Sequence, residues 1–169
     1  PTHPYVIRYV DAVTCLVRDM EDPTLLIEQR IHFSHIAPKG FGTADCIIYN
    51  KDLLHVIDFK YGQSVLVETE NNPQMILYAL GAIRQLKIIP KEIKMTIFQP
   101  RMDNLSTWTI TAAELQKIGQ QIKPSAKMAW EGKGELSAGD HCTFCPYKNI
   151  CTEFKSYFTD KYLVTYLGG

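Results

Sequence analysis

Apolar residues recur every three to four positions between residues 4 and 18, which predicts a helix at the start of the chain. Short apolar runs bounded by turn residues predict five strands, at residues 25–31, 42–49, 53–60, 94–98 and 106–110. Further helices are expected at residues 73–86 and 111–131, and a short one after residue 151. The order αβββαββα predicts an α/β fold in which helices flank a mixed central sheet.

Local signals fix where several of these elements begin. Asn72 is a good N-cap and Pro73 suits the first helical position, so a helix is expected to start there. Thr111 and Glu114 have the spacing of a capping box for the next helix. The short polar stretch 50–52 lies between two strand-like runs and predicts a hairpin.

Length and composition set broad limits. A chain of 169 residues with 46% apolar residues is long enough to bury a core, and we expect one domain over 1–169. No stretch is long and apolar enough to span a bilayer, and no signal peptide is visible. Five cysteines, three of them close together, favour a reducing cytoplasm over a disulfide framework, so we expect a cytoplasmic protein without membrane contact.

Candidate chemistry begins with Asp58 and Lys60, which lie two apart on an apolar run and therefore share one face of the expected strand. The chain holds four acid-x-Lys triplets, and chance accounts for most of them. The surroundings distinguish this one, because the hairpin brings Asp45 onto the neighbouring strand, close enough to share a metal ion with Asp58. On the following helix, Gln74 and Tyr78 are four residues apart and share a face.

Taken together, Gly42 to Asp45, Asp58 to Lys60, and Gln74 to Tyr78 match the series G-x-x-D, D/E-x-K and Q-x-x-x-Y. In this the chain resembles the PD-(D/E)XK nuclease superfamily, and most closely its RecB-like exonuclease branch. The amino-acid sequences of residues 54–61 and 70–81 are similar to those of a phage and prophage family of predicted nucleases. The resemblance extends over about residues 25–154 and implies a restriction-endonuclease-like core.

The resemblance implies a metal-dependent DNA nuclease of exonuclease type that hydrolyses phosphodiester bonds in phage recombination, replication or DNA processing. Asp45, Asp58 and the backbone carbonyl of Phe59 would hold Mg²⁺ or Mn²⁺, which prefer hard oxygen ligands. Lys60 would position the attacking water, and Gln74 and Tyr78 would orient Lys60, the water or the DNA backbone. Single- or double-stranded DNA, and phage recombination proteins, would be the partners.

A third metal ligand is left open. Glu28 is a candidate because its strand is expected beside the hairpin, and a solvated strand position is the equal alternative. The three histidines His32, His35 and His55 are interpreted as structural or exposed residues rather than ligands.

A cysteine segment at residues 141–154 carries Cys142, Cys145 and Cys151 with the spacing C-x2-C-x5-C. In RecB-like nucleases with a [4Fe–4S] cluster, three such cysteines join a fourth far upstream. Neither Cys15 nor Cys46 matches that fourth cysteine, and no early His or Glu ligand is found, so we expect the family's N-terminal segment to be missing. Zinc, with His141 or Cys15 as an additional ligand, and free thiols are the alternatives.

The net charge of zero is unusual for a duplex-binding protein, which is generally basic. Basic residues that would follow a DNA backbone are nonetheless present, and a solvated face is the alternative for each: Lys60, Arg84, Lys87, Lys91, Lys94, Arg101, Lys117, Lys123 and Lys127. The competing function is a catalytically inactive nucleic-acid-binding or assembly module on the same fold. Metal-dependent cleavage of RNA is a third hypothesis.

Overall fold

The computed structural model describes the backbone of residues 3–167 and the side chains of residues 3–159. The chain divides into two compact units, Pro1–Trp130 and Glu131–Gly169, and each is described by itself. A single domain over 1–169, with the cysteine segment at 141–154 as part of it, stays a prediction.

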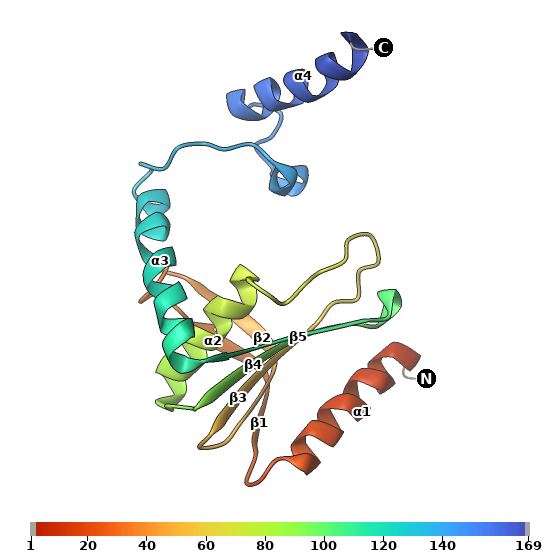
Figure 1. Ribbon diagram of the computed structural model, residues 1–169, viewed down its shortest axis with the longest axis vertical. Coiled ribbons are helices and arrows are strands. Elements are labelled where there is room, and N and C mark those ends of the chain that lie inside the picture. The colour runs from red at the N-terminus through yellow and green to blue at the C-terminus, as the bar shows by residue number, and fades with distance from the viewer. Residues whose placement is uncertain (1–2, 168–169) are drawn as a thin grey trace. The chain divides into compact units, whose positions relative to one another are not determined.

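The first unit is built on a five-stranded sheet in the order β1-β2-β3-β4-β5 (Figure 1). The strands are β1 (Thr24–His32), β2 (Phe41–Tyr49), β3 (Leu53–Phe59), β4 (Glu92–Gln99) and β5 (Asn104–Thr111). Strands β3 and β4 are parallel, and every other neighbouring pair is antiparallel. The sheet is therefore mixed, and the order αβββαββα is confirmed.

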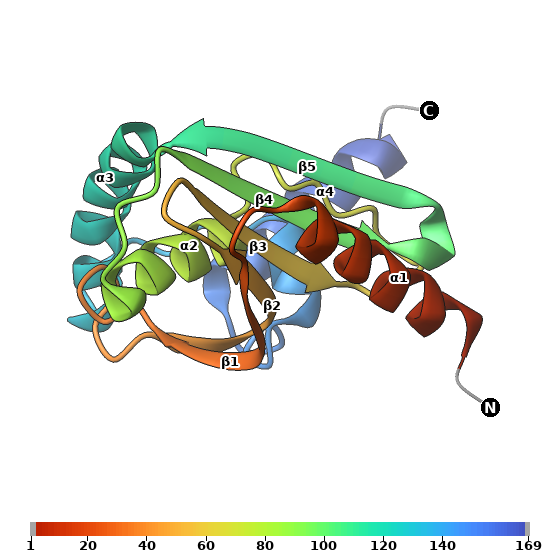
Figure 2. The ribbon, with the colours of Figure 1, turned by 90° about the horizontal axis from the view of Figure 1, so that it is seen from below.

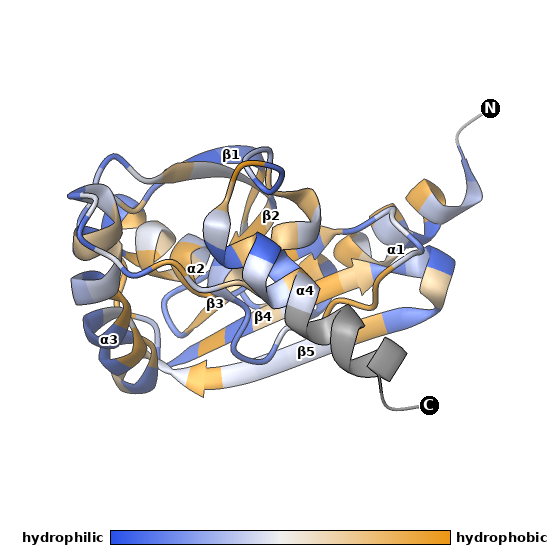
Figure 3. Cartoon of the chain, turned by 90° about the horizontal axis from the view of Figure 1, so that it is seen from above, coloured by the Kyte–Doolittle hydropathy of each residue, from blue (hydrophilic) through white to orange (hydrophobic). Residues whose placement is uncertain are grey.

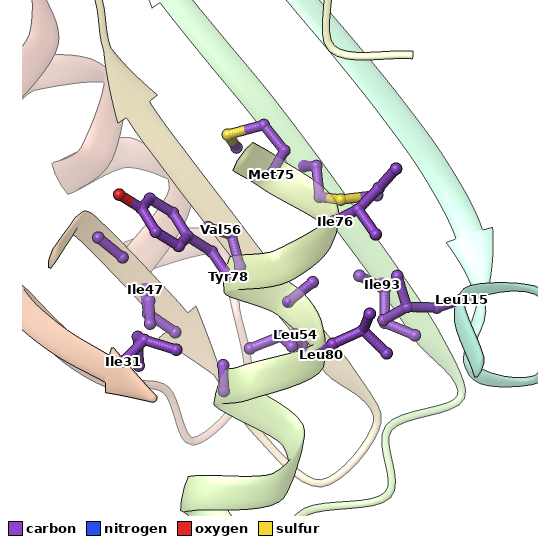
Figure 4. Close-up of a cluster of buried hydrophobic side chains, with 14 of the residues drawn as sticks. Ile31, Ile47, Leu54, Val56, Met75, Ile76, Tyr78, Leu80, Ile93 and Leu115 are labelled. Carbon is purple, nitrogen blue, oxygen red and sulfur yellow. The ribbon is translucent and has the colours of Figure 1, made fainter. Parts of the chain in front are cut away.

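Helix α2 (Pro73–Leu86) connects the two parallel strands and covers one face of the sheet together with α3 (Ala112–Trp130). Asn72 caps α2 by accepting hydrogen bonds from the amides of Gln74 and Met75, as its position in the sequence predicted. The main apolar core lies between these helices and the sheet (Figure 4). Its fully buried members include Ile47, Leu54, Val56, Met75, Ile93 and Leu115.

Helix α1 (Pro4–Asp19) packs on the opposite face of the sheet (Figure 2). Tyr9, Val13 and Val17, which are four residues apart, lie against a second apolar cluster. That cluster contains Cys46, Ile48 and Ile57 from the two hairpin strands. Figure 3 shows how apolar residues concentrate in the sheet while polar residues occupy much of the helices' outer sides. Helices thus flank both faces of the sheet.

Two 3-10 turns were not expected, and one helix is longer than expected. Turn η1 (Pro100–Met102) joins β4 to β5, and η2 (Asp140–Phe144) lies in the second unit. Helix α4 (Thr152–Leu167) is not the short helix that was predicted, because no Gly or Pro interrupts the sequence until Gly168. Among the described helices, none has the length and apolar character needed to cross a membrane.

Candidate active site

Asp58 and Lys60 meet at the carboxyl end of β3, where the strand leaves the sheet. Their side chains form an ion pair, with 2.8 Å between Lys60 Nζ and Asp58 Oδ2. The Asp58 side chain is only 3% exposed and that of Lys60 31%. Glu92 and Lys94 have the same spacing but form a longer, 3.8 Å pair whose acid is half exposed. Burial of the acid therefore distinguishes the Asp58 pair from this similar triplet.

Gln74, at the start of α2, connects both members of the pair. Its amide Nε2 donates to Asp58 Oδ1 at 2.9 Å, and its Oε1 accepts from Lys60 Nζ at 2.9 Å. The same Nε2 lies 3.3 Å from the hydroxyl oxygen of Tyr78 and donates to it. The Gln74 side chain thereby fixes the positions of the Asp58 carboxylate and the Lys60 ammonium, which lie on the same side of the strand. The shared face predicted for Gln74 and Tyr78 is what allows this contact.

Gly42 on β2 makes room for the Tyr78 ring. A Cβ atom at this position would lie 2.5 Å from Tyr78 Cε1 and 2.8 Å from its hydroxyl oxygen, which is closer than real Cβ atoms approach. The glycine of the G-x-x-D series therefore has a steric reason here. It lets the ring lie against the strand, from where its hydroxyl reaches Gln74.

Asp45 lies on β2 beside the end of β3, as the hairpin predicted. Cys46, which follows Asp45, pairs with Ile57, which precedes Asp58, in the antiparallel register of β2 and β3. The backbone amide of Phe59 donates to Asp45 Oδ2 at 2.7 Å. Burial raises the pKa of Asp45, and the negative charges of Asp58 and Glu28 raise it further, whereas this amide hydrogen bond and Lys60 oppose the rise.

Glu28 faces Asp45 across the β1–β2 ladder, between the paired residues Ile27↔Cys46 and Gln29↔Ala44. Its φ is +49°, a left-handed conformation that is uncommon for a residue other than glycine. Such a conformation inside a strand costs on the order of 1–3 kcal/mol and often marks a functional position. Glu28 itself is exposed. Its strand does lie beside the hairpin, while its role as a ligand stays a prediction.

The donor groups at this position suit a hard divalent cation. The negative charges of Glu28 and Asp58 both act on the Asp45 carboxylate, and the Lys60 ammonium opposes them. These three carboxylates and one ammonium leave a local excess of negative charge. Asp58 Oδ2 is buried and has no hydrogen bond, only the ion pair with Lys60. Carboxylate oxygens are the ligands that Mg²⁺ and Mn²⁺ prefer. Asp45 and Asp58 therefore suit the expected ion as two oxygen donors, and within the described residues no third His, Cys, Asp or Glu side chain completes a metal-holding group with them.

The cysteine segment fits a metal group less well. Cys142 is buried in η2, Cys145 and Cys151 are partly buried, and all three are free thiols. Of the expected alternatives for a further zinc ligand, Cys15 is exposed on α1, and His141 lies in η2 with its Nε2 2.9 Å from the carbonyl oxygen of Ser137. Within the described residues, no three or more His, Cys, Asp or Glu side chains are arranged to hold a metal ion. We therefore derive no chemistry from an iron–sulfur cluster or zinc here.

The loop between Lys60 and α2 is held in place by residues that the sequence did not point to. Gln99, at the end of β4, is 1% exposed and donates to the carbonyls of Gly62 and Val65. Thr69 is fully buried, donates to the carbonyl of Ser106, and accepts from the amide of Ile97. The only signal for these residues in the sequence was Gln99, a glutamine at a buried strand position. Its role can be recognised only once the order of the strands in the sheet is known.

Comparison with known proteins gives a family and solved structures to which the chain is similar. A family model described as protein of unknown function (DUF2800) matches residues 2–162. The crystal structure of SSO0001 is 16% identical in sequence and superposes with a TM-score of 0.44, over 87% of this chain and 68% of that one.

Proposed function

We propose that this chain, which belongs to the DUF2800 family, is a divalent-metal-dependent nuclease that hydrolyses phosphodiester bonds of DNA. The observation that carries the proposal is the buried network in which Gln74 holds Asp58 and Lys60 together beside Asp45. The resemblance of these residues to the PD-(D/E)XK series, in its RecB-like form, supports the same reaction. The phage processing role and the exonuclease mode belong to the proposal as well.

Asp45 and Asp58 would hold Mg²⁺ or Mn²⁺, with the Phe59 carbonyl as an additional oxygen donor, and exposed Glu28 is either a further donor or a solvated strand residue. A divalent ion at such a site lowers the pKa of a bound water and neutralises charge on a phosphate oxygen. The local excess of carboxylates over ammonium groups supports this assignment, since a divalent cation relieves their mutual repulsion.

Lys60 supplies the second positive charge of the proposed site. Its ammonium lies within 2.9 Å of both Asp58 and Gln74, so its position is fixed before any substrate arrives. A fixed charge aimed at a developing negative charge stabilises a transition state without reorganisation, and loss of one such donor typically costs about 10²–10³-fold in rate. Gln74 acts as a positioning residue, because it restrains Lys60 and Asp58 through one amide group.

The competing function is an inactive nucleic-acid-binding or assembly module. Burial of a carboxylate costs free energy, and a module that only binds does not need the Asp58 carboxylate to be buried beside a partly exposed lysine. The presence of the pair at the end of β3, with its acid 3% exposed, therefore favours the enzyme.

The test combines metal binding with cleavage. Calorimetry with Mn²⁺ is expected to show binding to the wild-type chain and a strong loss in Asp58→Ala. Cleavage of DNA is expected to require the metal and to fall about 10²–10³-fold in Lys60→Ala. Lys133→Ala is the matched control, because it removes a lysine of the same acid-x-Lys spacing whose side chain is 70% exposed. Cleavage that persists in both Asp58→Ala and Lys60→Ala would refute the assignment, and parallel RNA substrates decide between the two nucleic acids.

A further inference from the structure

A polar cavity of about 530 Å³ lies at the far end of α2 from the candidate active site. Its walls come from the end of β1, the loop that follows it, and the last turn of α2 with the residue that caps it. The lining residues are His32, Ser34, His35, Arg84, Gln85 and Lys87. Each carries a hydrogen-bond donor, and the set contains no carboxylate.

The positive charge of this cavity is not neutralised within the described part of the chain. No carboxylate there lies within ion-pair distance of Arg84 or Lys87. Burial lowers the pKa of His35, and the positive charges of Arg84 and of Lys123 on α3 lower it further, while Lys87 lines the same cavity as Arg84. In a chain with zero net charge, this is a local concentration of one sign.

The helix dipole is a simpler explanation for the cations at the end of α2, but it does not explain the other residues that line the cavity. The helix dipole favours Arg84 and Lys87 near the C-terminus of α2. It does not account for the two histidines and the serine that β1 and its following loop contribute to the same cavity. Donors from separate segments converge on this hollow, and that convergence is what an anion requires.

The cavity and the candidate active site lie at opposite ends of α2, and the helix between them is packed against the sheet. Tyr78 faces Gly42 of β2, and Gly81 packs against Ile31 of β1. Gln85 then donates to the carbonyl of Arg30 and accepts from the amide of His32. From Gln74 to Arg84 the helix rises about 15 Å, at ~1.5 Å per residue. Because Tyr78 and Gly81 are buried against the sheet, a ligand that reaches both places has to pass over the outer surface and span at least this distance.

We propose that the cavity at Arg84, Lys87 and His32 binds a backbone phosphate of the nucleic acid strand whose scissile bond lies at Lys60. The inference rests on the proposed nuclease function and adds a second anchoring point. At ~3.4 Å per nucleotide, a separation of about 15 Å corresponds to four or five nucleotides. The second anchor therefore contributes only to substrates at least that long.

The experiment measures the salt dependence of oligonucleotide binding without metal, so that no cleavage occurs. The probes are fluorescently labelled single strands of about 3 and about 16 nucleotides, which bracket the expected separation. Each lost phosphate contact reduces the slope of log K against log salt by about 0.7 for a single strand. We expect Arg84→Gln to reduce the slope by about that amount with the long strand, and we expect the short strand, which can occupy only one of the two places, to give a smaller slope than the long strand in the wild-type chain.

Arg18→Gln is the matched control, since Arg18 is exposed on α1, which covers the opposite face of the sheet. An unchanged slope in Arg84→Gln and in Lys87→Gln would overturn the inference, as would equal slopes for the short and long strands with the wild-type chain. Failure of the wild-type chain to bind the long strand would also overturn it. Metal-dependent cleavage with unchanged slopes would refute the cavity alone. Binding that depends on the cavity, without cleavage by the wild-type chain, would instead refute the proposed function.

Discussion

Substitution of Gly42 by alanine tests whether the glycine exists to admit the Tyr78 ring. The added Cβ would lie 2.5 Å from the ring, so the ring has to move by about 1 Å to reach ordinary van der Waals contact. Tyr78 is 8% exposed inside the main core, and overpacking of a core typically costs about 1–3 kcal/mol. Alanine also stabilises by about 0.4–1 kcal/mol through the unfolded chain, which leaves a net loss of about 1–2 kcal/mol.

Urea unfolding followed by tryptophan fluorescence measures this loss, because Trp108 packs against the same core. With a slope of about 2 kcal/mol/M, the midpoint is expected to fall by roughly 0.5–1 M. Gly62→Ala is the matched control, since no atom lies within 4 Å of a Cβ at that position and its φ is not left-handed. Its stability is expected to stay within about 0.5 kcal/mol of wild type.

The reasoning has a second, stricter test. In a Tyr78→Leu background the clashing ring is absent, so Gly42→Ala is expected to cost nothing further. A double-mutant cycle then gives a coupling energy of about 1–2 kcal/mol. If Gly42→Ala is no more destabilising than Gly62→Ala, or if its cost is the same in both backgrounds, the steric explanation is wrong.

Two further predictions concern buried titratable groups. Burial lowers the pKa of His55 from 6.5 to about 4, so the unfolded chain binds the proton more tightly and stability falls as the pH drops through this interval. We expect wild type to lose about 2–3 kcal/mol more than His55→Gln between about pH 7 and about pH 4.5 in urea unfolding, and equal losses would contradict this. Burial raises the pKa of the Cys46 thiol to about 11, so alkylation at neutral pH is expected to modify exposed Cys15 first and Cys46 only on unfolding. Mass spectrometry of the alkylated peptides checks the order, and early modification of Cys46 would refute it.

Much of the fold follows from local patterns in the sequence. The capping residues Asn72 and Thr111 begin their helices as predicted, with the Glu114 side chain accepting from the Thr111 amide at 2.8 Å. The alternation that places Asp58 and Lys60 on one face is confirmed by their contact. These features depend on neighbours only a few residues away, so sequence alone is sufficient to find them.

Other features depend on contacts that no local pattern encodes. The left-handed conformation of Glu28 and the buried position of Gln99 both arise where distant segments meet. The cavity at Arg84 forms because β1 and the end of α2 are adjacent, and the sequence of neither segment predicts this proximity. Helix α4 is longer than the predicted short helix because no Gly or Pro follows Thr152 before Gly168.

The hydrogen bonds between the Lys60 loop and the strands at the β5 edge of the sheet have a consequence for how the candidate site loses its structure. Gln99 lies next to β5, an edge strand, and Ser106 on that strand holds Thr69 in the loop. Edge strands open locally at free energies below that of global unfolding. Fraying of β5 would release the loop, and with it the geometry of Lys60, while most of the core stays folded. Heat would then inactivate the site at a lower temperature than it unfolds the protein, and amide exchange at Ser106 would report that earlier event.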